Sequence, residues 1–325
     1  MRLQGDNRRM SEALPVAIVG AGVVGLTTAV VLIEHGGYAP VIFSSNRTSN
    51  TTSSVGAAVW FPYDAEPEPL VAAWGLLSYG RFAELARVPD TGVSMIDFEY
   101  RSAHDDVHVP EWAESIGYRR LQPSKDSPYL SAFQVRVPLM DTTRYLRYLE
   151  KRTKLTDELF RCVSLNALTE IPADFPVVVN CSGYGARALV VDDEMIAHRG
   201  QVAVVEKLAH VPAFALDKPL TYVIPRENDC VFGGVNETSE DIAPNHELTR
   251  EIVARCSKML NLQRSPSVLA EPVGIRPARK AGVRLQAERL GDGRLVVHNY
   301  GHGGCGVSLS WGCAQKVLQL VETFR

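Results

Sequence analysis

Two clusters of glycine, at opposite ends of the chain, are the first residues whose spacing indicates chemistry. Gly20, Gly22 and Gly25 stand in the run Gly-Ala-Gly-Val-Val-Gly, directly after the apolar segment 16–19. In such a loop the first glycine allows a tight turn, the second lets the backbone approach a pyrophosphate, and the third lets a helix pack on the preceding strand. The helix that follows presents free N–H groups and a positive dipole end to the phosphates. The spacing therefore predicts a dinucleotide site.

The end of the next apolar run leaves the identity of the dinucleotide open. An acidic residue about 20 residues after the loop usually hydrogen-bonds a ribose hydroxyl, but this chain has Phe43-Ser44-Ser45-Asn46-Arg47 there. Ser45 or Asn46 could bind a ribose more weakly than a carboxylate does. Ser45 together with Arg47 would also suit the 2′-phosphate of NADP. These residues alone are compatible with FAD and with NADP.

The second glycine cluster, Tyr300-Gly301-His302-Gly303-Gly304-Cys305-Gly306, favours a flavin. It follows the strand-like run 295–299 and leads into a helical segment that begins near Ser308. A nicotinamide dehydrogenase has no general need of such a turn near its C-terminus. An isoalloxazine ring, in contrast, must lie against backbone, with donors for the negative charge that develops on reduction. A glycine turn at the start of a helix offers those donors.

Composition excludes several other classes. The chain has 325 residues, with 34 basic and 37 acidic side chains and a net charge of −3, which gives no electrostatic reason to expect nucleic acid or a membrane as a partner. We find no apolar stretch of the length that a signal peptide or a membrane span needs. The six cysteines include no C-x-x-C pair. We expect buried free thiols in a cytoplasmic protein and no metal, although a single disulfide stays open.

Several motifs together resemble those of the D-amino-acid oxidase family. They run in family order through almost the whole chain, and the most specific is His-Asn-Tyr-Gly-His-Gly-Gly-Cys-Gly-Val-Ser, which begins at His298. The matching segments are 16–28, 51–63, 178–188, 199–201, 222–225, 274–279, 284–285 and 298–312. The resemblance implies non-covalent FAD and the oxidative deamination of D-amino acids. The α-hydrogen would leave as hydride to flavin N5, and oxygen would yield hydrogen peroxide, with a 2-oxo acid and ammonia as the other products.

The resemblance also implies roles for individual residues. Arg276 would bind the substrate carboxylate through its planar fork, with help from the Tyr222 hydroxyl, and the Gly304 carbonyl would receive the amine. His298 and His302 are expected to be structural, because the family needs no side-chain base. The residues implied in FAD binding are Gly20, Gly22, Val23, Val24, Gly25, Ser44, Ser45, Thr51, Thr52, Ser53, Gly56, Ala57, Val163, Ser182, Gly183, Gly303, Gly304, Gly306, Val307 and Ser308.

Three departures from the family pattern modify these expectations. The segment 216–221 is short and lacks the tyrosine that acts as a lid in members from higher organisms, which predicts an open site with less gated product release. Asn236 stands where D-aspartate oxidases carry an extra arginine, which favours neutral substrates. Ser45 replaces the ribose-binding acid and puts tight FAD binding in doubt. The alternatives are an oxidase for glycine, a secondary amine or D-aspartate, and, in another class, an NADP-binding Rossmann protein.

Hydrophobic patterning predicts the elements that must position these residues. We expect strands over 16–19, 38–43, 95–100, 176–180, 201–206, 221–224, 230–232 and 295–299, and helices over 26–34, 64–90, 141–154, 247–260 and 308–322. Asp141 is the expected cap of its helix, and residues 1–14 read as a loose tail. Strand–glycine–helix units at the start, middle and end predict an α/β fold with two interleaved domains. These are a Rossmann-like FAD-binding domain of 12–60, 138–198 and 286–325, and a β-rich substrate domain of 61–137 and 199–285. A homodimer is the assembly considered.

Overall fold

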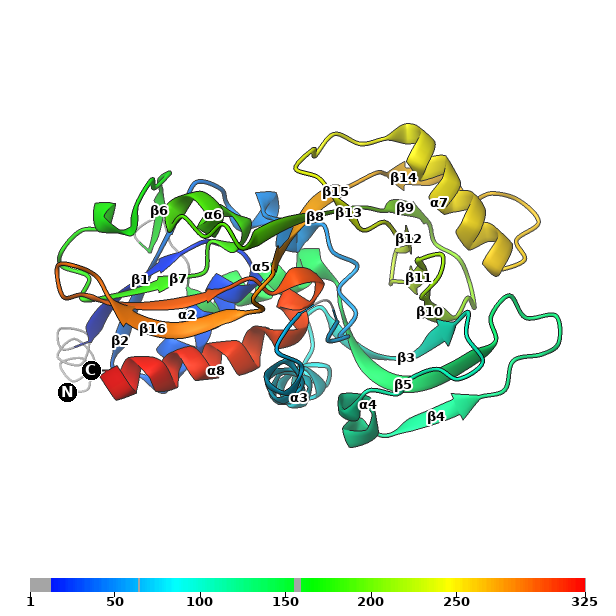
Figure 1. Cartoon of the computed structure of the whole chain (residues 1–325), viewed down its shortest axis with the longest axis horizontal. Coiled ribbons are helices and arrows are strands. Elements are labelled where there is room, and N and C mark those ends of the chain that lie inside the picture. Colours follow the sequence, from blue (N-terminus) through cyan, green and yellow to red (C-terminus); the bar gives the residue numbers. More distant parts are fainter. Residues whose placement is uncertain (1–12, 64, 155–158, 325) are drawn as a thin grey trace.

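A six-stranded sheet carries the N-terminal glycine loop (Figure 1). The computed structural model describes residues 13–63, 65–154 and 159–324, so the tail expected over 1–14 lies almost wholly outside the described residues. Neighbouring strands pair in parallel, except that the last two strands along the chain pair antiparallel with each other. In spatial order they are β16 (Arg284–Arg289), β17 (Leu295–Tyr300), β7 (Val177–Asn180), β1 (Leu14–Val19), β2 (Tyr38–Ser44) and β6 (Phe160–Cys162).

Helices α2 (Val23–His35), α5 (Thr142–Thr153) and α8 (Gly306–Phe324) accompany this sheet, and α2 packs against both of the others. The buried side of α2 is formed largely by small and branched residues, which matches its apolar sequence. The Asp141 carboxylate accepts a hydrogen bond from the backbone N–H of Arg144, so the predicted cap of α5 is confirmed. Helices α2 and α8 both begin at a glycine cluster, and this places the two clusters at the ends of neighbouring helices.

An eight-stranded sheet forms the other half of the molecule (Figure 1). Helix α7 (His246–Met259) packs on its β9, β11 and β12 strands, while α3 (Glu68–Leu85) and α4 (Glu111–Ile116) lie against β5. Its strands in spatial order are β14 (Val268–Ala270), β9 (Ala203–Glu206), β12 (Asp229–Gly233), β11 (Thr221–Pro225), β10 (Ala213–Leu216), β3 (Val93–Ser102), β5 (Ser131–Met140) and β4 (Tyr118–Leu121).

A three-stranded sheet joins the two halves (Figure 1). It consists of β13 (Glu237–Thr238), β8 (Met195–Gln201) and β15 (Val273–Arg279), with β8 in the centre. The single strand predicted over 201–206 is therefore wrong. The chain leaves one sheet after Gln201 and enters another at Ala203, and apolar patterning cannot detect this change because both strands are buried. Short elements complete the described chain: α6 (Ala186–Leu189) and the 3₁₀ turns η1 (Thr48–Asn50), η2 (Thr52–Ser54), η3 (Leu168–Glu170), η4 (Gly183–Gly185) and η5 (Gly303–Cys305).

The predicted helices are confirmed with shifted ends. The helix expected over 64–90 spans only Glu68–Leu85, because Pro67 precedes it in an extended conformation. The six cysteines are free, as expected, but only five are buried. Cys162 is exposed because it ends the edge strand β6, which corrects the expectation that all the thiols are buried. Within the described residues, no helix is long and apolar enough to cross a membrane.

Candidate active site

A cavity of about 430 Å³ lies where the two halves meet. The start of α2, the segment 52–63, strands β3, β10, β11 and β15, and the turn before α8 all contribute to its wall. It brings together thirteen of the residues selected from the sequence: Val23, Val24, Thr52, Ser53, Gly56, Ala57, Tyr222, Arg276, Gly303, Gly304, Gly306, Val307 and Ser308. The other selected residues lie outside its wall: Gly20, Gly22, Gly25, Ser44, Ser45, Thr51, Val163, Ser182 and Gly183.

The N-terminal glycine loop has the close backbone approaches that its spacing predicts. Gly20 has a φ of 110°, and a Cβ atom there would lie 2.4 Å from the carbonyl oxygen of Cys181. A Cβ atom on Gly25 would lie 2.0 Å from the carbonyl oxygen of Gly20. No side chain fits at either position, so α2 begins directly against β1 and β7. The backbone surface at the start of α2 fits the phosphates of a dinucleotide.

The hydroxyl-rich segment meets the start of α2. The Ser53 hydroxyl accepts a hydrogen bond of 3.0 Å from the backbone N–H of Val23. A Cβ atom on Gly22 would lie 3.1 Å from the same hydroxyl. Two motifs 30 residues apart thus form one polar surface at a helix N-terminus. The N–H groups and the hydroxyls there can share an anionic ligand.

Most of the remaining selected residues lie at the carboxyl ends of β1, β2, β6 and β7. The backbone N–H of Val163 donates to the Ser44 carbonyl at 3.1 Å, which ties the end of β6 to the end of β2. Ser182 follows β7, and its backbone N–H donates to the Asn180 side chain at 3.2 Å. Ser45 is exposed beside them. Adjacent parallel strands end at one edge of the sheet, which is where open α/β sheets bind nucleotides.

The distal glycine turn lies next to the first one. A Cβ atom on Gly306 would lie 3.9 Å from the Val24 side chain, so the starts of α2 and α8 face each other across a short gap. The Ser308 hydroxyl accepts a hydrogen bond of 3.0 Å from the backbone N–H of Phe61. A Cβ atom on Gly304 would lie 2.3 Å from the Tyr63 hydroxyl. The phenol of Tyr63 therefore packs directly on the backbone of Gly304.

His302 lies within this turn and is almost fully buried. Its Nε2 atom donates to the Asn299 side-chain oxygen at 3.1 Å, and burial lowers the pKa of its imidazole to about 4. The ring is therefore neutral at physiological pH and committed to a hydrogen bond inside the protein. These contacts support the structural role expected for His302.

The low pKa of His302 predicts a pH dependence of stability. The unfolded chain binds a proton at an ordinary histidine pKa of about 6.5, whereas the folded protein does so only near 4. The stability that neutral His302 contributes is complete above pH 6.5 and is lost as the pH falls toward 4, by up to about 3 kcal/mol. The free energy of unfolding, measured with denaturant at pH values between 4 and 6.5, should fall more steeply with decreasing pH for the wild-type protein than for His302→Gln. Equal slopes would contradict this assignment.

Arg276 and Tyr222 form the polar end of the cavity. The Arg276 Nη1 atom donates to the Val235 carbonyl at 3.0 Å and to the Asn236 side-chain oxygen at 3.4 Å. A Cβ atom on Gly200 would lie 2.5 Å from the same guanidinium, so Arg276 rests flat on the β8 backbone. Burial raises the pKa of the Tyr222 hydroxyl, and the nearby Arg276 charge opposes that rise. The pair offers two kinds of donor to one carboxylate.

The Tyr222 ring also lies on bare backbone. A Cβ atom on Gly233 would lie 2.0 Å from its ring, and one on Gly234 would lie 2.2 Å from it. Tyr222→Phe keeps this packing and removes only the hydroxyl beside Arg276. We expect kcat/KM for a D-amino acid to fall about tenfold, mainly through KM, because one hydrogen bond from an uncharged donor to the carboxylate is lost. Steady-state kinetics with D-alanine checks this, and an unchanged KM would contradict it.

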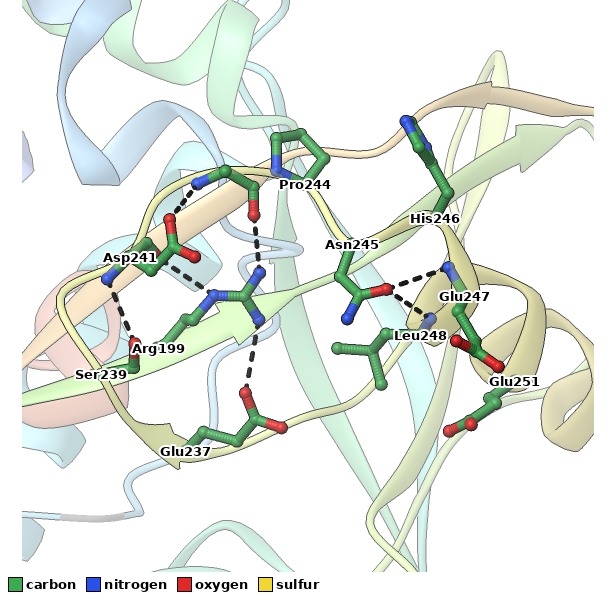
Figure 2. A pocket seen from close by; sticks show the side chains of 11 residues that line it. Arg199, Glu237, Ser239, Asp241, Pro244, Asn245, His246, Glu247, Leu248 and Glu251 are labelled. Carbon is green, nitrogen blue, oxygen red and sulfur yellow. Dashed lines mark hydrogen bonds and ion pairs between the residues drawn. The ribbon is translucent and has the colours of Figure 1, made fainter.

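A second hollow, beside Arg199, carries no comparable chemistry (Figure 2). The Arg199 side chain is only 5% exposed. Its guanidinium donates to the carbonyls of Asp241 and Ala243 at 2.9 and 2.8 Å. These bonds fix the loop that follows Asn236, and Asn236 in turn contacts Arg276. Arg199 therefore stabilises the loop next to Asn236, the residue that contacts Arg276.

Sequence reasoning missed five residues of the cavity wall, four of them aromatic and one acidic. Phe61, Tyr63, Phe98, Tyr100 and Asp217 all line the cavity, and none of them was selected as a site residue. Phe98 and Tyr100 alternate along the strand run that patterning had already detected, but their partners across the sheet are distant in sequence. The segment that contains Asp217 is distinctive in the sequence only because it is short. No local signal assigns these residues to the site.

Comparisons with known proteins agree with this geometry. The sequence profile of the family described as FAD dependent oxidoreductase matches residues 15–320. A D-amino-acid oxidase of Streptomyces coelicolor is 38% identical over 99% of this chain and 100% of its own length. One of Rubrobacter xylanophilus is 37% identical over 93% and 94%. A glycine oxidase structure from Bacillus cereus, 17% identical, covers 96% of both chains with a TM-score of 0.79, which shows a shared fold. The chain therefore belongs to the D-amino-acid oxidase family of FAD-dependent oxidoreductases.

Proposed function

We propose that this enzyme oxidises neutral D-amino acids to 2-oxo acids, with release of ammonia and hydrogen peroxide. The family binds FAD non-covalently, and the N-terminal glycine loop at the start of α2 fits the phosphates of that group. The observation that carries the proposal is that one cavity is lined by Arg276 and Tyr222, which would bind the substrate carboxylate, and by the backbone of Gly303 and Gly304. Each substrate consumes one oxygen and one water, which balances the products.

The protein residues act mainly by positioning. FAD supplies the redox chemistry when bound, as acceptor of the α-hydrogen with its electron pair and as donor of two electrons to oxygen. Arg276 and Tyr222 hold the substrate carboxylate, and the Gly304 carbonyl orients the neutral amine. With three substituents of the α carbon fixed in this way, an L-amino acid would place its side chain where the hydrogen must lie. Orientation of this kind accounts for selectivity without a side-chain base.

Two further features support neutral substrates and an open site. Asn236 contacts Arg276 with a neutral side chain, so no second cation is available there for the β-carboxylate of D-aspartate. The connection between β10 and β11 consists of residues 217–220 only, and Leu216 pairs directly with Thr221. A hairpin this short forms no long lid, which supports rapid product release.

The test uses the purified protein directly. We expect a yellow protein whose flavin absorbance survives gel filtration, and peroxide release with neutral D-amino acids. The panel contains D- and L-alanine, D-methionine, D-aspartate, glycine and sarcosine. Peroxide only with glycine or sarcosine would replace the proposal with a glycine or secondary-amine oxidase. A colourless protein that stays free of added FAD but binds NADP would overturn it altogether.

We also propose the two-part division of the chain predicted from the sequence. The six-stranded sheet draws its strands from residues 14–44, 160–180 and 284–300, and the eight-stranded sheet from 93–140 and 203–270. This interleaving supports an FAD-binding domain that the chain enters three times. The free cysteines support a cytoplasmic location. A homodimer stays a prediction, which light scattering of the purified protein would test.

A further inference from the structure

Two charged side chains line the cavity wall among the described residues, and their charges are opposite. One is Arg276, the proposed carboxylate binder, and the other is Asp217, which follows β10. Asp217 lies in the short connection between β10 and β11. Asp217 is only partly buried, so its carboxylate puts a negative charge within reach of a ligand in an otherwise largely apolar cavity.

Strand register places Asp217 on the cavity face of the sheet. Ala215 pairs with Tyr222 on one side and with Tyr100 on the other, so these three residues form one row across three strands. Side chains alternate along a strand, so Asp217 lies on the same face as Ala215, and Phe98 on the same face as Tyr100. All five residues line the cavity. Arg276 reaches this cavity from β15 in a different sheet.

Aromatic faces line the space around Asp217. The rings of Phe61 and Tyr100 stack at 17° with their centroids 5.5 Å apart, and Phe98 packs against Phe61 at 5.5 Å. Tyr63 extends this wall toward Gly304. Such a wall accepts the methylene groups of a long side chain, and its ring faces attract a cation. A cavity with an arginine, an aromatic wall and a carboxylate thus matches a molecule with a carboxylate, an alkyl chain and a cationic end.

Asp217 is held as an anion by the protein. Its Oδ1 atom accepts hydrogen bonds from the backbone N–H groups of Ala103 and Lys218 at 2.9 and 2.6 Å, and Oδ2 accepts one from the Ser102 hydroxyl at 2.6 Å. Burial would raise the pKa of this carboxyl, but the hydrogen bonds outweigh burial and lower the pKa below its ordinary value. A carboxylate accepts about four hydrogen bonds, so acceptor capacity is left for a ligand.

We propose that Asp217 is a specificity-determining residue that receives the cationic end of a basic D-amino acid, such as D-lysine, D-ornithine or D-arginine. The proposal rests on the oxidase function above and extends its substrate range from neutral to basic side chains. Acidic side chains are disfavoured by the same carboxylate. The reaction at the α carbon is unchanged, because Asp217 acts on the far end of the substrate.

The test compares substrate pairs of similar shape in three proteins. D-lysine is compared with D-norleucine, and D-glutamate with D-glutamine, in the wild-type enzyme, in Asp217→Asn and in Asp97→Asn. The asparagine at 217 can keep the backbone bonds through its oxygen and donate to Ser102 through its amide, so only the charge is lost. Asp97 is the matched control, because it lies on the opposite face of β3 and its side chain is 59% exposed.

We expect Asp217→Asn to lower the ratio of kcat/KM for D-lysine over D-norleucine by about tenfold or more, and to raise that of D-glutamate over D-glutamine. Activity with D-norleucine and the flavin spectrum should be preserved, and Asp97→Asn should match the wild type. Unchanged ratios in Asp217→Asn would overturn the proposal, as would a wild-type enzyme that oxidises D-norleucine but discriminates against D-lysine. The comparison of D-lysine with D-norleucine in the wild-type enzyme therefore tests the proposal even without a folded variant. Failure to oxidise any D-amino acid would instead refute the proposed function.

Discussion

Replacing Arg276 with alanine is expected to lower kcat/KM for D-alanine by about a thousandfold while the protein stays yellow. In its proposed role the guanidinium supplies a charge-assisted contact to the substrate carboxylate, and its loss would leave that anion in a largely apolar cavity. A thousandfold loss corresponds to about 4 kcal/mol of transition-state stabilisation. Because the carboxylate also fixes the orientation of the α-hydrogen, the loss should appear in kcat as well as in KM. Stopped-flow reduction of the bound flavin separates these two effects.

Two further variants serve as comparisons for Arg276→Ala. Arg276→Lys keeps the charge but not the planar fork, and we expect it to recover only part of the activity. Arg264→Ala removes an arginine that is 74% exposed and pairs with Glu206, and it should behave as the wild type. Near-normal activity of Arg276→Ala would refute the carboxylate role.

Replacing Gly25 with alanine is expected to abolish FAD binding. The added Cβ atom would lie 2.0 Å from the Gly20 carbonyl oxygen, and that atom belongs to backbone that cannot rotate away. Helix α2 must therefore move off β1, which destabilises the fold by about 1–3 kcal/mol and displaces the N–H groups proposed to bind the FAD phosphates. Titration of the apoprotein with FAD, followed by flavin fluorescence, and thermal unfolding measure the two effects.

Gly80→Ala is the matched control for this substitution. Gly80 lies within α3, and a Cβ atom there would meet nothing within 4 Å. We expect a gain in stability of about 0.5–1 kcal/mol, because alanine is the better helix former, and unchanged FAD binding. If Gly25→Ala binds FAD as tightly as Gly80→Ala does, then the glycine loop does not hold the cofactor.

The cofactor half of the site could be predicted because its signals are local. Gly20, Gly22 and Gly25 lie between an apolar strand and an apolar helix, and the close contact of Gly25 is with Gly20 of the same motif. The close contact of Gly20, in contrast, is with Cys181 after β7, which the motif does not contain. Tyr222 and Arg276 came from the family resemblance, since a tyrosine in a strand and an arginine before a proline have no distinctive local pattern. The structure then places both at one cavity.

The substrate half could not be predicted, because it depends on pairing between distant strands. Phe98 and Tyr100 reach the cavity through the parallel pairing of β3 with β10, more than a hundred residues later. The backbone surface on which the Arg276 guanidinium packs depends on the register of β8 with β15. This register puts Gly200, which has no side chain, opposite Gly274. The sheet change at Val202 escaped detection for the same reason. Hydrophobic alternation assigns a face to each strand but does not choose its neighbours.

The most direct test is anaerobic reduction of the bound flavin by the two enantiomers of one neutral amino acid. D-alanine should bleach the yellow absorbance of the wild-type protein rapidly and completely, and L-alanine should leave it unchanged over the same period. Admission of oxygen should then restore the colour with one hydrogen peroxide formed for each flavin reoxidised. Equal bleaching by both enantiomers, or none by either, would contradict the assignment of this cavity to D-amino acid oxidation.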